Sequence, residues 1–307
     1  MEMELSMNSS RNNVESTLFF GNGLNLLTDN QPDWGNLLTE LSRISRVEIS
    51  NIKVKPYTMI YEEILLRSGF EESELKECVK NIVSDFQGNE IYEEISNLKF
   101  TNYITTNYDL TLEKVFNNSL FFKYLSDQSE AFYSIRSKFK ILNKFGQHVS
   151  NVWHIHGDIK RKKTISLGLD HYCGSIGKID SYIKGTYTFK KNKTEQKPKS
   201  IALKIKNKEE RDNLSWIELF FYSDIHIIGY GIDYSETDIW WILNRRARIK
   251  NIQNKIYYYG ELDFHKVELL NAFNVEYIEI KRDETLQKKG WLDLYEKIII
   301  EIKQRRL

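Results

Sequence analysis

The sequence has few cysteines, few prolines and almost no net charge. Its 307 residues include two cysteines and three prolines, and the formal net charge is +1. Cys78 and Cys173 lie far apart and form no C-x-x-C pair, so they indicate neither a tetrathiolate zinc site nor a secreted disulfide scaffold. The near-neutral charge gives no electrostatic basis for non-specific binding of nucleic acid.

Long apolar segments are also missing. No apolar run approaches the ~20 residues that are needed to cross a bilayer, and the polar N-terminus lacks the apolar core of a signal peptide. The hydrophobic content of 41% and the charged content of 28% are those of a soluble globular protein. We therefore expect a cytoplasmic protein with an N-terminal tail over residues 1–16 and one domain over residues 17–307.

Short apolar runs alternate with helical patterns along the chain. Runs with the character of strands begin at Thr17, Asn102, Val152, Asp224, Lys255 and Val275. Most of them are flanked by segments whose apolar spacing is near 3.6 residues, which is typical of helices. Strands that feed helices indicate βαβ units. The pattern predicts an α/β fold with a Rossmann-like, mostly parallel sheet and helices on both faces.

Two regions interrupt this alternation. Residues from about 55 to 98 have helical patterns, and we expect a small helical insert beside the sheet. Residues from about 184 to 210 are rich in lysine and carry one of the three prolines. We expect a solvated loop or an exposed ribbon there in preference to a specific binding surface.

Glycine turns follow two of the predicted strands. The segment "GNGLN" places Gly21 and Gly23 after the first strand, and "GYG" places Gly229 and Gly231 after a later one. Glycine permits positive φ angles and a close approach of backbone amides to an anionic ligand. Two such turns in one sheet favour a ligand with two phosphates, although the G-x-G-x-x-G and P-loop patterns are absent. The segment Ser235–Asp238 that follows has the pattern of a helix-capping box.

Polar clusters follow two other strands. The segment "HIHGD" contains His154 and His156, and alternation along a strand predicts that both imidazoles point to one face. Ligand crevices form at the carboxyl ends of strands in α/β proteins. From this segment alone, a buried structural histidine, half of a metal site and a functional histidine all stay open. The segment "TTNYD" is the other cluster, and its Asn107 or Asp109 alternatively caps a helix.

Taken in order, the segments "GNGLN", "PDW", "TTNYD", "HIHGD" and "GYG" with a later acidic residue resemble the sirtuin-like family. They are most similar to its prokaryotic NAD-consuming branch, which acts in anti-phage defence. The resemblance extends from about Thr17 to Ile242. The "GNG" form also resembles the AbiH-like abortive-infection proteins.

This resemblance implies a role for each matching residue. Asn107 and His156 are implied to be catalytic, with Asn107 beside the nicotinamide ribose and His156, directly before a glycine, as the base. His154 matches no catalytic position and is expected to be a packing residue. The implied cofactor-binding residues are Gly21, Asn22, Gly23, Asn25, Asp33, Trp34, Thr106, Asp109, Gly229, Tyr230, Gly231 and Asp238.

The activity that the resemblance implies is hydrolysis of NAD to nicotinamide and ADP-ribose, as an effector of abortive infection. Cleavage of the nicotinamide–ribose bond builds positive charge on the ribose, and a histidine base suits the activation of water near neutral pH. The four-cysteine zinc module of protein-deacylating sirtuins is missing, so we expect neither a metal nor deacylation. Two alternatives stay open, namely cyclisation or transfer of ADP-ribose and a non-catalytic nucleotide-binding sensor.

Control of such an activity is needed because an always-active NAD hydrolase would poison its own cell. The segment after Ile249 is predicted to complete the sheet, so no stretch of the ~100 residues typical of a separate domain is left for a sensor. We therefore expect a homo-oligomer of low basal activity and a second, regulatory polypeptide. Apart from NAD we expect no membrane partner, and nucleic acid only as an indirect one.

Overall fold

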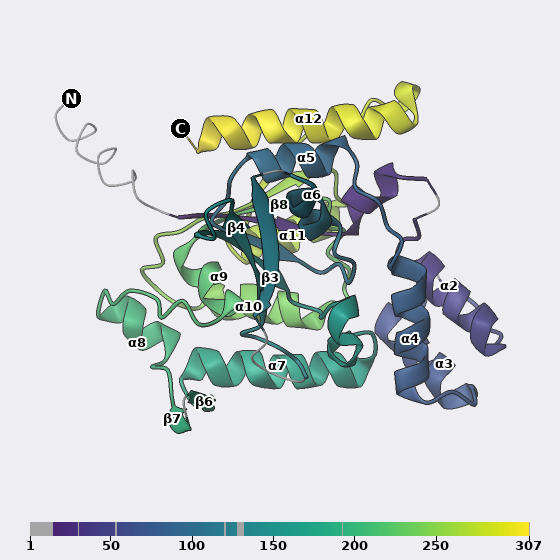
Figure 1. The fold of residues 1–307 in the computed structure, drawn as a ribbon, viewed down its shortest axis with the longest axis horizontal. Helices are drawn as coiled ribbons and strands as arrows, with labels where there is room; N and C mark the ends of the chain where they lie inside the picture. Colours follow the sequence, from purple (N-terminus) through teal and green to yellow (C-terminus); the bar gives the residue numbers. More distant parts are fainter. Residues whose placement is uncertain are drawn as a thin grey trace.

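The computed structural model describes residues 15–29, 31–52, 54–119, 121–127, 132–191 and 193–306. The expected N-terminal tail, residues 1–16, lies outside these ranges except for its last two residues. Helices lie on both faces of a central sheet (Figure 1). Across the described ranges, no helix combines the length and the apolar character that are needed to cross a membrane.

Within the described residues, the central sheet has the strand order β10-β9-β8-β1-β2-β5-β4-β3. These strands are β1 Ser16–Phe20, β2 Asn102–Thr105, β3 Phe122–Asp127, β4 Lys138–Asn143, β5 His148–His154, β8 Asp224–Ile228, β9 Ile256–Gly260 and β10 Glu276–Glu279. All neighbours from β10 to β5 are parallel, whereas β4 and β3 are antiparallel. Counted along the chain, the parallel strands have the order 3-2-1-4-5-6 of the dinucleotide-binding fold. The predicted Rossmann-like α/β fold is confirmed.

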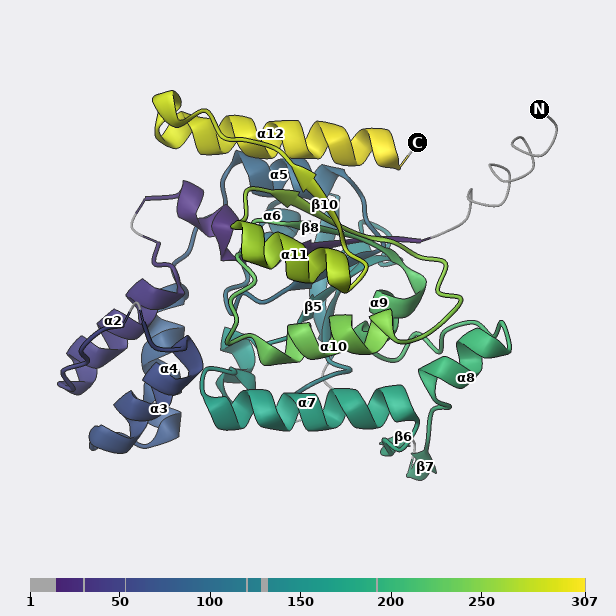
Figure 2. The ribbon, with the colours of Figure 1, turned by 180° about the vertical axis from the view of Figure 1, so that it is seen from behind.

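Helices form a layer on each face of this sheet (Figures 1 and 2). One layer holds α5 (Glu90–Asn97), α6 (Thr111–Asn118) and α12 (Lys288–Arg305), and the other holds α7 (Leu169–Lys184), α9 (Leu219–Tyr222), α10 (Thr237–Ala247) and α11 (Phe264–Ala272). The central strand β1 contacts both layers, because alternate residues of a strand point to opposite faces. Leu18 and Phe20 pack in the core under α5 and α12, and Phe19 packs in the core under α7 and α10. Burial on both faces explains why β1 ends in three consecutive apolar residues, Leu18 to Phe20.

A helical lobe lies at one side of the sheet (Figure 1). It consists of α2 (Trp34–Ser45), α3 (Tyr57–Arg67) and α4 (Glu72–Val83) and has its own apolar core, which Ile165 and Leu167 of the main body join. Within the expected insert, α3 and α4 belong to this lobe, whereas α5 packs against α6 and α12 on the sheet. The short 3₁₀ helices are η1 Asn22–Leu27, η2 Ile159–Thr164, η3 Trp216–Glu218 and η4 Glu284–Leu286.

The lysine-rich segment contains a small antiparallel ribbon and a short helix. The ribbon is formed by β6 (Phe189–Lys191) and β7 (Thr194–Gln196), and α8 (Ile201–Lys206) follows it. Figure 1 shows the ribbon beyond one end of α7, away from the central sheet. Phe189 anchors it, because its ring is buried and lies 4.0 Å from the guanidinium carbon of Arg136.

Candidate functional site

The two glycine turns pack against each other at the carboxyl edge of the sheet. They follow β1 and β8, which are neighbours at the point where the strand order reverses, and ligands of open α/β sheets bind in the crevice at such a point. The Gly23 amide donates to the Gly229 carbonyl oxygen at 2.8 Å, and a Cβ atom on Gly23 would lie 2.7 Å from that oxygen. Gly229 has a φ angle of +57°, which favours glycine. Close packing of the two turns therefore requires glycine at Gly23, and the positive φ angle favours glycine at Gly229.

A cavity of about 450 Å³ opens at these turns. Its volume is within the ~300–1,000 Å³ that is usual for small-molecule sites. The lining begins at Trp34 and Tyr57 of the helical lobe, passes Gly23 and Gly229, and ends at Trp291 of α12. The cavity therefore extends from the helical lobe past the glycine turns to α12.

Most of the predicted site residues line this cavity. They are Asn22, Gly23, Asp33, Trp34, Thr106, Asn107, Asp109, His156, Gly229, Tyr230 and Gly231. Three others lie behind its wall, since Gly21 packs against the second glycine turn, Asn25 is buried beside Asp109, and Asp238 is buried beside His156. Asp33 also caps α2, because its carboxylate accepts the Asn36 amide at 2.7 Å.

A buried hydrogen-bond network holds the side chain of Asn107. Asn25 donates to the Asp109 carboxylate at 2.8 Å and accepts from the Tyr92 hydroxyl at 2.6 Å. The Asn107 Nδ2 atom lies 3.4 Å from both the Tyr92 hydroxyl and the Gly21 carbonyl oxygen. The Asn107 Oδ1 atom is buried and has no partner among the described residues. An unpaired buried acceptor costs about 1–3 kcal/mol, so this oxygen is suited to receive a hydrogen bond from a ligand.

His154 and His156 lie on opposite sides of the sheet, so the prediction of a shared face is wrong. Strand β5 ends at His154 and the chain turns before His156, so strand alternation does not extend to the second imidazole. His154 lies 2.8 Å from the Glu113 carboxylate of α6 and 2.7 Å from the Asn107 carbonyl oxygen. Burial lowers the pKa of His154, but Glu113 outweighs this effect and the pKa rises to about 9.

His156 borders the cavity with both ring nitrogens near protein groups. Its Nε2 atom lies 3.2 Å from the Asp238 carboxylate, and its Nδ1 atom lies 3.4 Å from the Tyr172 hydroxyl. Ser175 of α7 donates to the same carboxylate at 3.2 Å. Burial lowers the pKa of His156, but Asp238 and then Glu236 outweigh this effect, so the pKa lies above its usual 6.5. These contacts favour the imidazolium form.

Glu236 is a cavity residue that the sequence pattern did not reveal. The predicted capping box is wrong, because α10 begins at Thr237 without a side-chain cap, Ser235 bonds to Asp233, and Asp238 points at His156. One Glu236 oxygen accepts the Asp233 amide at 2.9 Å, and the other lies 4.0 Å from His156 Nδ1. Burial raises the pKa of Glu236 to about 7.

Comparison with known families connects this geometry to a known domain. Residues 101–198 match the model of the SIR2-like domain. The matched segment includes both Asn107 and His156 and supports a sirtuin-like family. It fits an NAD-related function, since SIR2-like proteins are generally NAD-dependent enzymes. No curated protein matches the sequence.

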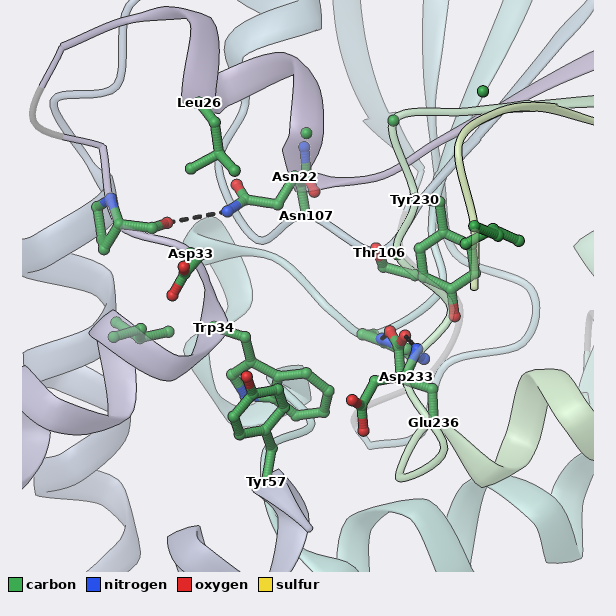
Figure 3. Close-up of a pocket in the computed structure, with 18 of the residues that line it drawn as sticks. Asn22, Leu26, Asp33, Trp34, Tyr57, Thr106, Asn107, Tyr230, Asp233 and Glu236 are labelled. Carbon is green, nitrogen blue, oxygen red and sulfur yellow. Dashed lines mark hydrogen bonds and ion pairs between the residues drawn. The ribbon is translucent and has the colours of Figure 1, made fainter. Parts of the chain in front are cut away.

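Aromatic rings form one wall of the cavity. The Trp34 ring lies 5.1 Å from the Tyr57 ring and 6.2 Å from the Tyr172 ring, measured between centroids. Figure 3 shows Trp34 and Tyr57 on one side, with Asp233 and Glu236 next to them. Tyr57 and Tyr172 come from α3 and α7, which no sequence motif connects, so only the fold brings them together.

In the described ranges, no group of three His, Cys, Asp or Glu side chains is arranged to hold a metal ion.

Proposed function

We propose that the protein hydrolyses NAD at the nicotinamide–ribose bond and releases nicotinamide and ADP-ribose. One observation carries the proposal: a single cavity at the strand switch point is lined by His156 and by Asn107 with its unpaired oxygen. Both residues belong to the SIR2-like match. In this proposal residues 17–307 act as one catalytic domain.

The shape and lining of the cavity suit a dinucleotide. The backbone of the second glycine turn lines the cavity at Gly231, and we assign the pyrophosphate to the amide of this turn. The nicotinamide ring of NAD is positively charged, and aromatic faces such as those of Trp34 and Tyr57 attract cations. The adenosine half then lies toward Trp291.

The charges around the cavity suit the bond cleavage. The C1′–N bond breaks with its electron pair on nicotinamide, which leaves neutral, while a water oxygen bonds to C1′ and loses a proton. Positive charge builds on the ribose in the transition state. The Glu236 carboxylate and the free oxygen of Asn107 provide a preorganised negative potential for that charge.

Product analysis tests the proposal. Purified protein incubated with NAD and EDTA should release nicotinamide and ADP-ribose in equal amounts, resolved by chromatography. A cyclic product without free ADP-ribose would show that the activity is cyclisation and not hydrolysis. Binding of NAD without any product would favour the alternative of a non-catalytic sensor.

Asn107→Ala should reduce turnover at least ~100-fold, the lower part of the range for losing a directly acting group. The exposed Asn118→Ala on α6 is the matched control and should keep wild-type turnover. Near-normal turnover in a folded Asn107→Ala protein would contradict the catalytic role that we assign to Asn107.

We further propose that depletion of NAD arrests an infected cell in an abortive-infection type of anti-phage defence. The activity then has to stay low until infection. Self-association or a second polypeptide is the proposed means of control, and the helical insert at about 55–98 and the lysine-rich segment at about 184–210 are the proposed contact surfaces.

A further inference from the structure

We infer that Glu236 takes the proton from the attacking water and that His156 is a positioning residue that orients the Glu236 carboxylate. The inference rests on the proposed hydrolysis of NAD. It assigns the base to a residue outside the five motifs that the sequence offers.

His156 is not free to act as a base. Its side chain is only 2% exposed, and its Nε2 and Nδ1 atoms are occupied by Asp238 and the Tyr172 hydroxyl. Asp238 is itself held by Ser175 and by the Ile239 amide at 2.9 Å, so the pair is rigidly placed. A general base needs a free atom within hydrogen-bond reach of the proton that it takes. An imidazolium between two fixed partners has none.

Glu236 meets this requirement. Its Oε2 atom is fixed by the Asp233 amide, whereas its Oε1 atom points toward His156 Nδ1 at 4.0 Å, beyond hydrogen-bond distance. The residue lines the cavity, and Figure 3 shows it beside Asp233. The Tyr230 phenol also donates a hydrogen bond to the Glu236 carboxylate. A carboxylate has about four acceptor positions, so Oε1, which faces the His156 charge, keeps one for a water in the cavity.

The groups that face Glu236 explain why it can exchange a proton near neutral pH. They are Asp233 and Asp238 beside it and His156 from the turn after β5. Four phenols also face it, namely Tyr108 after β2, Tyr172 of α7, Tyr230 of the second glycine turn and Tyr258 of β9. Burial raises the pKa of Glu236, while the His156 charge lowers it, and the result is about 7. Burial also raises the pKa of each of the four phenols, so they stay neutral. A base is most effective with a pKa near the working pH.

The step balances with these groups alone. The C1′–N bond breaks and its electron pair moves to nicotinamide, the water oxygen forms a bond to C1′, and one water proton passes to Glu236 Oε1. The protonated carboxyl then releases the proton to solvent. His156 keeps its own proton throughout, which separates this assignment from one in which the imidazole is the base.

Glu236→Gln is the direct test, because it keeps the side-chain size and an oxygen for the Asp233 amide. We expect kcat for NAD to fall at least ~100-fold with little change in KM. In the wild type, kcat should fall as pH drops below about 7, because Glu236 becomes protonated, and Glu236→Gln should lose this acid limb. Glu94→Gln, the same change on the exposed face of α5, should retain the wild-type rate and profile.

Chemical rescue gives a second test, which does not depend on whether the Glu236→Gln variant folds. Glu236→Ala should recover turnover when formate is added, since formate can occupy the vacated space as a base, whereas His156→Ala should show no recovery. Retention of kcat and of the acid limb in Glu236→Gln, or absence of rescue in a folded Glu236→Ala, would overturn the inference. A wild-type protein without any NAD turnover would instead refute the proposed function and this inference together.

Discussion

Two buried histidine–carboxylate pairs differ in the side of the sheet on which they lie. His154 pairs with Glu113 in the core under α6, and His156 pairs with Asp238 beside α10 at the cavity. In both pairs the carboxylate supplies the stabilisation of charge that solvent would provide at the surface. Removing one partner of such a pair leaves an uncompensated buried charge and is strongly destabilising. The first pair therefore stabilises the fold, and the second fixes a residue of the site.

Glu113→Gln should lower the free energy of unfolding by about 3–5 kcal/mol at pH 6. The pKa of His154 is raised from 6.5 to about 9 in the folded state, so the contribution of the pair is fully present below pH 6.5 and is lost as pH rises through 9. The difference between wild type and variant should therefore be much smaller at pH 9.5. Urea unfolding at the two pH values measures it, and an equal difference at both would contradict the charged pair.

At the scale of elements, the site depends on two turns that touch through their backbones. The β8 turn combines positive φ angles at Gly229 and at the buried, β-branched Ile232, +57° and +39°. A positive φ angle in a β-branched residue is strained, and the surrounding structure has to hold it. The contact with Gly21 and Gly23 is one such restraint.

Gly23→Ala should disrupt this contact, because the added Cβ would lie 2.7 Å from the Gly229 carbonyl oxygen. Overpacking of this kind costs about 1–3 kcal/mol, which should lower the melting temperature by several degrees. Gly231→Ala is the matched control, since its Cβ would meet nothing within 4 Å. Thermal unfolding of both variants measures the difference, and equal melting temperatures would show that the turns do not need this close approach.

The sequence predicts those elements whose burial leaves a pattern in the chain. Strand β1 is recognisable because Leu18, Phe19 and Phe20 are buried from both faces. Motif order locates Asn107 and the glycine turns, because special backbone positions and polar strand ends are marked by residue type. The end of β5 at His154 leaves no such mark, and Glu236 resembles part of a helix cap. Side chains that reach the cavity only through tertiary packing, such as Tyr172 of α7, have no local pattern at all.

At the scale of the whole molecule, we propose that contacts with other chains control the proposed activity. We expect a homo-oligomer with low basal turnover, so that NAD hydrolysis per mole of protein rises with protein concentration. Light scattering and turnover across a concentration series measure this together. A monomer with full activity that is independent of concentration would contradict the expectation.

Two surface variants distinguish the proposed contact surfaces. Leu66 of α3 is 81% exposed on the helical lobe, and Lys191 of β6 is exposed on the lysine-rich ribbon. Leu66→Glu should weaken association if the lobe forms the contact, and Lys191→Glu should do so if the ribbon forms it. If a variant leaves the oligomer intact, the surface that carries its substitution is excluded as the contact surface.

The central pairing of β1 with β8 has a consequence for the synthesis of the chain. Thr17 of β1 and its partner Ser223, just before β8, are 206 residues apart. At ~5–20 residues per second a ribosome needs about 10 to 40 s to make that interval, and the entropy of closing so long a loop must also be overcome before the strands pair. Until then the first glycine turn has no neighbour and Glu236 has not been made. A nascent or prematurely terminated chain therefore has no complete cavity, so translation itself delays the appearance of the proposed activity.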